Sequence, residues 1–125
     1  MSAGLSRSSA VGLAVLAATL GGGCGHEASV APGGTIRVAL NEYRLVPATI
    51  RLRPGALTIV ATNVGRLTHN LVVSRGSTTV GSIRPLGPGQ SGQLTLRLSS
   101  GTYLVGSTLL SDEALGLYGH LVVAG

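Results

Sequence analysis

A few side chains with the types needed for catalysis or metal binding are spread along this sequence of 125 residues. His69 begins the apolar run HNLVV, Ser107, Asp112 and Glu113 follow a later apolar run, and His120 lies near the end. Serine, histidine and aspartate together form the triad of many hydrolases. Imidazole and carboxylate groups also bind zinc or copper(II). The sequence therefore offers two kinds of chemistry, and both require these residues to meet in the fold.

The elements that must position them are predicted to be short β-strands. TIRVAL and TIRLR alternate apolar residues with arginine or other polar residues, LTIVATNV is rich in β-branched residues, and HNLVVSR and QLTLRLS continue the pattern. Turn signals with proline and glycine separate these runs, and no helix of useful length is indicated. We expect an all-β domain of seven to eight strands, built as an antiparallel Greek-key sandwich or small barrel.

Two long segments of the chain have a recognisable pattern, NEYRLVPATIRLRPGALTIVATNVGRLTHNLVV and GTYLVGSTLLSDEALGLYGHLVV. They resemble the cupredoxins of the plastocyanin, rusticyanin and sulfocyanin type. In that family a ligand histidine follows a turn, as His69 does here, and a strand with the pattern G-x-Y-x-x-x-C leads into a loop that supplies Cys, His and Met. Gly101 and Tyr103 match this pattern, and the resemblance covers nearly all of residues 35–123. The resemblance implies a cupredoxin-like fold.

The same resemblance implies that three of the four copper ligands are missing. Ser107 stands in the position of the cysteine, Asp112 in that of the second histidine and Leu117 in that of the methionine. A type 1 copper site needs a thiolate and two imidazoles, usually with a weak axial ligand. We therefore expect His69, Ser107, Asp112 and Leu117 to be the positions of a degenerate copper site, with no metal and no cofactor. Copper handling or electron transfer through an atypical copper site is the alternative.

The same residues could in principle serve other functions. A Ser107–His69–Asp112 triad is disfavoured because the sequence has no nucleophile elbow and no recognisable oxyanion hole, and we expect a protein that is not an enzyme. A zinc or copper(II) site of His69, Asp112 and Glu113 is a further alternative, but His120, which would extend it, precedes an inward-facing leucine and should point away. The preferred prediction is a hydrogen bond in which Asp112 or a backbone carbonyl accepts the N–H of His69.

The N-terminal part of the chain resembles an export signal. Residues 1–23 carry a positive charge at Arg7, an apolar run from Ala10 to Leu20 and three glycines before Cys24, the only cysteine. This pattern resembles a lipobox, and predicts acylation at Cys24 and anchoring of an exported protein at a membrane. Residues 24–34 are predicted to be a flexible tether, and residues 35–125 the cupredoxin-like domain.

The charge and composition restrict the partners. The net charge is +5, all nine basic residues are arginines, and the chain has three tyrosines but no phenylalanine or tryptophan. Scattered arginines without aromatic stacking platforms argue against nucleic-acid binding. An exposed apolar patch with charged residues around it is predicted at the end that carries the degenerate site, and would bind a protein of the cell envelope. Its residues are Arg66, Leu67, Leu109, Leu110, Leu115 and Leu117, with Asp112 and Glu113 at its border.

Overall fold

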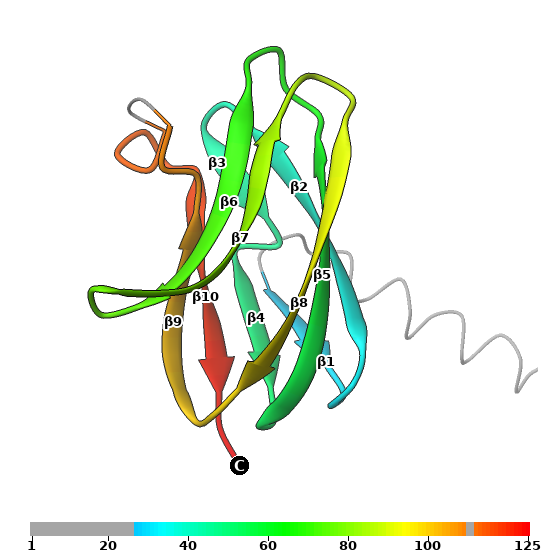
Figure 1. Cartoon of the computed structure of the whole chain (residues 1–125), viewed down its shortest axis with the longest axis vertical. Helices are drawn as coiled ribbons and strands as arrows, with labels where there is room; N and C mark the ends of the chain where they lie inside the picture. Colours follow the sequence, from blue (N-terminus) through cyan, green and yellow to red (C-terminus); the bar gives the residue numbers. More distant parts are fainter. Residues whose placement is uncertain (1–26, 110–111) are drawn as a thin grey trace, which may run out of the picture.

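The structure, a computed structural model, describes residues 27–109 and 112–125 and contains ten strands in these ranges (Figure 1). They are β1 (Glu27–Val30), β2 (Thr35–Asn41), β3 (Arg44–Val46), β4 (Thr49–Leu52), β5 (Gly55–Asn63), β6 (His69–Arg75), β7 (Thr78–Leu86), β8 (Ser91–Leu98), β9 (Gly101–Gly106) and β10 (Tyr118–Val123). Within these ranges, no helix has the length and apolar character needed to cross a bilayer. The predicted signal peptide and Cys24 lie outside the described residues.

The strands form two sheets that face each other. The larger sheet has the order β1-β4-β10-β9-β6-β7, and the smaller has the order β3-β2-β5-β8. Along β5 the side chains of Leu57, Ile59 and Ala61 are buried, while the residues between them are partly exposed. This alternation puts every second side chain between the sheets.

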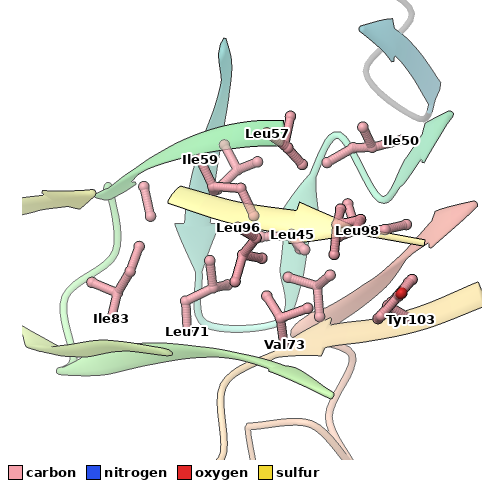
Figure 2. Close-up of a cluster of buried hydrophobic side chains, with 14 of the residues drawn as sticks. Leu45, Ile50, Leu57, Ile59, Leu71, Val73, Ile83, Leu96, Leu98 and Tyr103 are labelled. Carbon is pink, nitrogen blue, oxygen red and sulfur yellow. The ribbon is translucent and has the colours of Figure 1, made fainter. Parts of the chain in front are cut away.

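Aliphatic side chains from both sheets fill the space between them, as Figure 2 shows for Leu57, Ile59 and Leu96 on one side and Leu71 and Val73 on the other. Among the residues that the structure describes, the core contains nineteen buried hydrophobic side chains, and only one of them, Tyr103, is aromatic. Burial of such side chains stabilises a fold by about 1.5–3 kcal/mol each relative to exposure. A core of this size can hold the two sheets together without a disulfide.

The predicted all-β sandwich is confirmed, but its strands are more numerous than the predicted seven to eight and are not all antiparallel. Three pairs are parallel: β1 with β4, β4 with β10, and β2 with β5. The chain passes from the larger sheet at β4 to the smaller sheet at β5, so strands that are not consecutive become neighbours. The alternation of side chains within a strand does not indicate the direction of its partner, and the sequence pattern therefore could not reveal these parallel pairs.

The first strand lies inside the segment that was expected to be a flexible tether. Glu27–Val30 pairs with Thr49–Leu52, the Glu27 carboxylate forms an ion pair with Arg51, and Val30 packs against the core. The folded part of the chain thus includes Glu27–Val30, ahead of the predicted domain start at Thr35. The composition of this segment suggested disorder because four residues cannot bury enough surface alone, but the edge of the larger sheet supplies the missing partner.

Three strands of the larger sheet bring the candidate residues to one end of the sandwich. β9 is antiparallel to both β6 and β10, so the start of β6, the end of β9 and the start of β10 lie together. The loop between β9 and β10, the β2–β3 turn and the β5–β6 loop gather at the same end, at the top of Figure 1. We call this part of the molecule the loop end.

Candidate functional site

The period of the strands directs three of the predicted site residues into the core. His69 has the same parity in β6 as the buried Leu71 and Val73, so its ring points between the sheets. Ser107 follows β9 with the parity of Tyr103 and Val105. Leu117 immediately precedes β10. His69, Ser107 and Leu117 are all fully buried.

Asp112 joins this group from the β9–β10 loop. Its side chain is also buried, with 7% of the residue surface exposed. Its Oδ2 atom lies 2.7 Å from His69 Nδ1 and accepts a hydrogen bond from Ser107 Oγ at 2.6 Å. Its backbone carbonyl accepts hydrogen bonds from the N–H groups of Leu115 and Leu117. The expected hydrogen bond between Asp112 and His69 is therefore present, and the aspartate also shapes the loop that carries it.

Glu42, in the β2–β3 turn, approaches the opposite edge of the same imidazole. Its Oε1 atom lies 3.5 Å from His69 Nε2, without the geometry of a hydrogen bond, and accepts hydrogen bonds from the backbone N–H groups of Leu67, at 2.8 Å, and Arg66. The hydrogen bond from the Leu67 N–H is the main cause that holds the pKa of the Glu42 carboxyl below its ordinary value. Glu42 is thus an anion at neutral pH, directed at a buried histidine.

Two asparagines organise the loops around the cluster. Asn63 is fully buried, donates to the carbonyls of Leu67 and Leu86, and accepts from the Gly65 N–H, which fixes the β5–β6 loop. Asn70 Oδ1 accepts from the Thr108 N–H at 2.8 Å and lies 3.0 Å from Ser107 Oγ, as a second acceptor for its hydroxyl beside Asp112, which joins the start of β6 to the end of β9.

Sequence reasoning missed Glu42, Asn63 and Asn70. Asn63 did carry a signal, because it is a polar residue at an inward position of LTIVATN. Glu42 and Asn70 occupy partly exposed positions, and their importance depends on contacts with residues far along the chain. A pattern in the local sequence does not reveal such contacts.

The arrangement of the cluster does not form a hydrolytic triad. In a triad the serine bonds to the histidine, and the aspartate orients the histidine from its other side. Here Ser107 Oγ bonds to Asp112 and Asn70, and none of its hydrogen bonds reaches His69. Ser107 and His69 are both completely buried, so a substrate could not reach a nucleophile at this position.

The donor atoms at these positions do not fit type 1 copper. The cluster offers one imidazole, one hydroxyl and one carboxylate, while Leu117 has no donor atom and the thiolate that such a site needs is missing. Among residues 27–109 and 112–125, no three His, Cys, Asp or Glu side chains are grouped so that they could hold a metal ion. Glu113 and His120 are exposed, and His120 lies edge-on to the ring of Tyr118 on the outer face of the sheet. The alternative site of His69, Asp112, Glu113 and His120 is therefore not assembled.

Large hydrophobic side chains are exposed at the loop end. Tyr43, Val64, Leu67 and Leu115 are exposed by 65%, 58%, 56% and 55%. The β9–β10 loop packs against the β2–β3 turn there, since a Cβ atom on Gly116, whose φ is +114°, would lie only 2.5 Å from the Tyr43 carbonyl oxygen. We call Tyr43, Val64, Leu67 and Leu115 the loop-end surface.

The predicted apolar patch agrees only in part with this surface. Leu67 and Leu115 are exposed, Leu109 is half-buried and Arg66 is exposed. The expectation that Leu117 and Asp112 contribute to it is wrong, because both side chains point into the interior. Leu110 lies outside the described residues.

Comparison with known proteins finds similar structures but no similar sequences. No protein-family model matches the chain, and no curated protein matches it. Auracyanin from Roseiflexus castenholzii superimposes with a TM-score of 0.68 at 21% identity, over 73% of this chain and 97% of that chain. Auracyanin A, a "blue" copper protein from Chloroflexus aurantiacus, gives 0.61 at 15% identity, over 73% and 100%. Rusticyanin from Thiobacillus ferrooxidans gives 0.62 at 14%, over 77% and 82%.

The described part of the chain therefore has the cupredoxin fold. At these identities the similarity establishes the architecture, and the residues at the loop end establish how this chain differs. The cupredoxin-like class predicted from the sequence is confirmed at the level of the fold.

Proposed function

We propose that this chain is a cupredoxin-like binding module that has no complete type 1 copper site and is not an enzyme. The observation that carries the proposal is that a hydrogen-bonded polar cluster occupies the ligand positions: a single oxygen of Asp112 contacts both His69 and Ser107. Leu117 closes the cluster with an aliphatic side chain. Such a cluster stabilises a loop conformation but offers no thiolate to a metal.

The binding activity is assigned to the loop-end surface. Exposed tyrosine, leucine and valine side chains on neighbouring loops are typical of protein–protein contact sites, which are apolar at the centre and charged around the border. Arg66 and Glu113 are exposed in the same loops and supply such a border, with Leu109 and Leu110 as candidate additions. The partner is proposed to be a protein of the cell envelope.

The location follows from the N-terminal segment. The export signal in residues 1–23 and the acylation of Cys24 would hold the domain outside the cytoplasm at a membrane surface. β1 begins three positions after Cys24, so the anchor and the fold are separated by a very short segment of chain. A membrane-anchored module needs no freely diffusing state to meet an envelope partner.

A copper-binding function with an atypical site is the second candidate. His69 favours it, since a buried imidazole at this position faces the cluster with Nδ1. The fold similarity to auracyanin A, a "blue" copper protein, favours it as well.

Metal analysis separates the two functions. The full chain, purified from medium that contains copper, should hold no stoichiometric metal. Its triple variant Ser107→Cys, Asp112→His and Leu117→Met should bind copper(II) and show the intense visible absorption of a copper–thiolate bond. Micromolar or tighter copper binding by the unmodified chain would establish the second candidate. A colourless triple variant would show that the loop geometry differs from that of a copper site.

Site-directed cross-linking tests the binding surface. A photoreactive residue at Leu67 or Leu115 should give the same discrete adduct in intact cells, because both positions are exposed at the loop end. Val80 provides a matched control, as it is exposed by 39% on β7 and lies outside the loop end. Equal cross-linking at Val80 would argue against a specific surface.

A further inference from the structure

A groove lies on the outer face of the larger sheet beside its edge strand β1, toward the end of β10 that is opposite the loop end. Its volume is about 520 Å³, and its walls are residues 29–32, residues 51–53 and residues at the end of β10. Ser29, Arg51 and Val122 form one row of strand partners, and this row alternates with buried residues of β4 and β10. The three strands lie next to one another in Figure 1, and their pairing gathers the lining on one face.

Backbone hydrogen bonds hold two walls of the groove in place. The chain turns after β1, and the Gly34 N–H donates to the Ala31 carbonyl at 2.9 Å. On the other side the Ala124 N–H donates to the Leu52 carbonyl at 3.0 Å, which fixes the end of β10 against β4. The groove is therefore preformed, and a ligand would not have to order a loop on binding.

The lining of the groove combines aliphatic surface with two arginines. Pro32, Val122 and Ala124 provide the aliphatic part. Arg51 and Arg53 are two positions apart on one segment and are both exposed, so their Cα atoms are about 7 Å apart on the same face. Two guanidinium groups at this spacing can bind one phosphate group from both sides.

The groove keeps a positive charge. Arg53 forms no ion pair with any carboxylate in residues 27–109 and 112–125. Arg51 is paired with Glu27, but 56% of the Arg51 side chain remains exposed. Two guanidinium groups thus face one carboxylate here, and an anionic ligand would complete the pairing.

The distribution of acidic residues over the molecule also favours an anion at the groove. Three of the four acidic side chains of the chain lie at the loop end, in the β2–β3 turn and the β9–β10 loop: Glu42, Asp112 and Glu113. The fourth, Glu27, is already paired with Arg51. A negatively charged surface would therefore attract the groove more strongly than the loop end.

We propose that this groove binds the headgroup of an anionic phospholipid, with Arg51 and Arg53 on the phosphate and the glycerol region against Pro32 and Val122. The sandwich would then lie with its β1 edge on the membrane and leave the loop-end surface open to a protein partner. This inference deepens the proposed function and rests on the proposed location at a membrane. One such contact orients an anchored domain but does not replace the acyl anchor.

The short segment after Cys24 supports a lipid as the occupant. Three residue steps separate Cys24 from Glu27, which span at most about 11 Å. The rise along β1 from Glu27 to Val30 adds about 10 Å. An acylated Cys24 would therefore keep the groove near the headgroups, where the local concentration of lipid is high.

A titration followed by NMR tests lipid binding in the full chain. The ¹⁵N-labelled protein in a neutral maltoside detergent is titrated with dihexanoyl phosphatidylglycerol. The amide signals of Ala31, Arg53 and Ala124 should shift in a saturable way, while that of Leu67 at the loop end should not. Absence of these shifts would overturn the proposal.

Two further titrations identify what the groove recognises. Dihexanoyl phosphatidylcholine, which has a phosphate but no net charge, should give much smaller shifts. Equal shifts would show that the negative charge of the lipid is not recognised, and would contradict the proposal. Inorganic phosphate should also be weaker because it cannot use the aliphatic wall, and an equal effect would mean an anion site without a role for lipid.

Paired arginine variants separate the groove from the general positive charge of the protein. Arg51→Gln combined with Arg53→Gln should weaken phosphatidylglycerol binding by about tenfold, since each arginine near an anionic lipid surface contributes roughly a fivefold gain. Arg37→Gln combined with Arg97→Gln is the matched control. It removes the same charge from exposed positions on the smaller sheet and should change the affinity by less than about twofold. Equal weakening by the two pairs would overturn the assignment to the groove.

The orientation on a bilayer provides a readout without a variant. The full chain is placed in phosphatidylglycerol-containing nanodiscs that carry a lipid with a gadolinium chelate on its headgroup. The amide signals of Ser29 and Ala124 should broaden more than those of Leu67 and Leu115. The opposite result would place the loop end on the membrane and overturn the proposal. Failure of acylation at Cys24 would affect the proposed location, but the titration in detergent would still decide whether the groove binds lipid.

Discussion

At the scale of residues, the Asp112 carboxylate connects several parts of the loop end. Asp112 contacts His69 and Ser107 through one oxygen, and its own carbonyl closes the loop through Leu115 and Leu117. The side-chain contacts lie in a region with very little solvent, where an unpaired polar group is costly. Much of the stability of this end should therefore be lost with the Asp112 side chain.

We predict that Asp112→Ala lowers the free energy of unfolding by about 3 kcal/mol, because it leaves His69 and Ser107 buried without their acceptor. Urea denaturation followed by circular dichroism would measure the change. The control Glu113→Ala, at an exposed neighbouring position, should change it by less than about 0.5 kcal/mol. Equal effects of the two substitutions would show that the cluster does not contribute to stability.

The lowered pKa of Glu42 predicts how the stability of the fold changes at acidic pH. Its carboxyl has a pKa below the ordinary value of 4.5, mainly because the Leu67 N–H donates to the ionised form. A group whose pKa is lower in the folded state contributes stability that is present above its unfolded pKa, and this contribution is lost as the pH falls through the folded value. The parent should therefore lose stability more steeply than Glu42→Gln below pH 4.5.

Urea midpoints of the two proteins across this acidic range would test the prediction, since the other carboxyl groups are common to both. The difference between the proteins should shrink as the pH falls. A constant difference would mean that the ionisation of Glu42 is not linked to folding.

At the scale of elements, β1 shows that the folded part of the chain includes residues ahead of Thr35. A four-residue strand at a sheet edge has few contacts of its own, but its backbone pairs with β4 and the Val30 side chain reaches the core. β4 would become the edge of the larger sheet if this strand were absent. The element is small, and its removal should weaken the fold without abolishing it.

We predict that a chain that begins at Thr35 still folds but is about 2 kcal/mol less stable than one that begins at Gly25. Backbone hydrogen bonds contribute about 1 kcal/mol each, and the entropy of ordering the strand opposes part of this gain. Thermal and urea unfolding of the two chains would measure the difference. Equal stabilities would restore the original prediction of a flexible tether.

At the scale of the whole molecule, the proposed location at a membrane depends on the N-terminal segment of the chain. The apolar core lies between the sheets, and the loop-end surface lies at one end of the sandwich. No helix in residues 27–109 and 112–125 is long and apolar enough to span a bilayer. The proposed attachment to a membrane rests on residues 1–23 and on acylation of Cys24.

We predict that Cys24→Ala releases the protein from the membrane fraction or blocks processing of its signal, because the acyl chains would supply the anchoring apolar surface. Fractionation of cells that express the full chain would measure the distribution. Ser29→Ala, an exposed change a few residues later, is the control and should remain bound to the membrane. Unchanged membrane association of Cys24→Ala would mean that the signal segment itself is retained as the anchor.

The sequence was sufficient for the features that depend on local periodicity. Alternation in HNLVVSR predicts a strand, which the structure confirms, and the inward positions that the structure gives His69 and Ser107 follow from the same alternation. The resemblance to cupredoxins placed Asp112 and Leu117 beside them. The strand predictions succeed because the side chains of a strand alternate between two faces regardless of what the strand pairs with.

Only the tertiary structure decided what surrounds the imidazole of His69. Glu42 and His69 are separated by a crossing of the chain between the two sheets, and no local pattern reports that the β2–β3 turn meets the start of β6. The parallel pairing of β1 and the inward position of Leu117 at the loop end depend in the same way on long-range contacts. The physical reason is that side-chain parity is a property of each strand, whereas charge neighbours and strand partners are set by how distant strands pack.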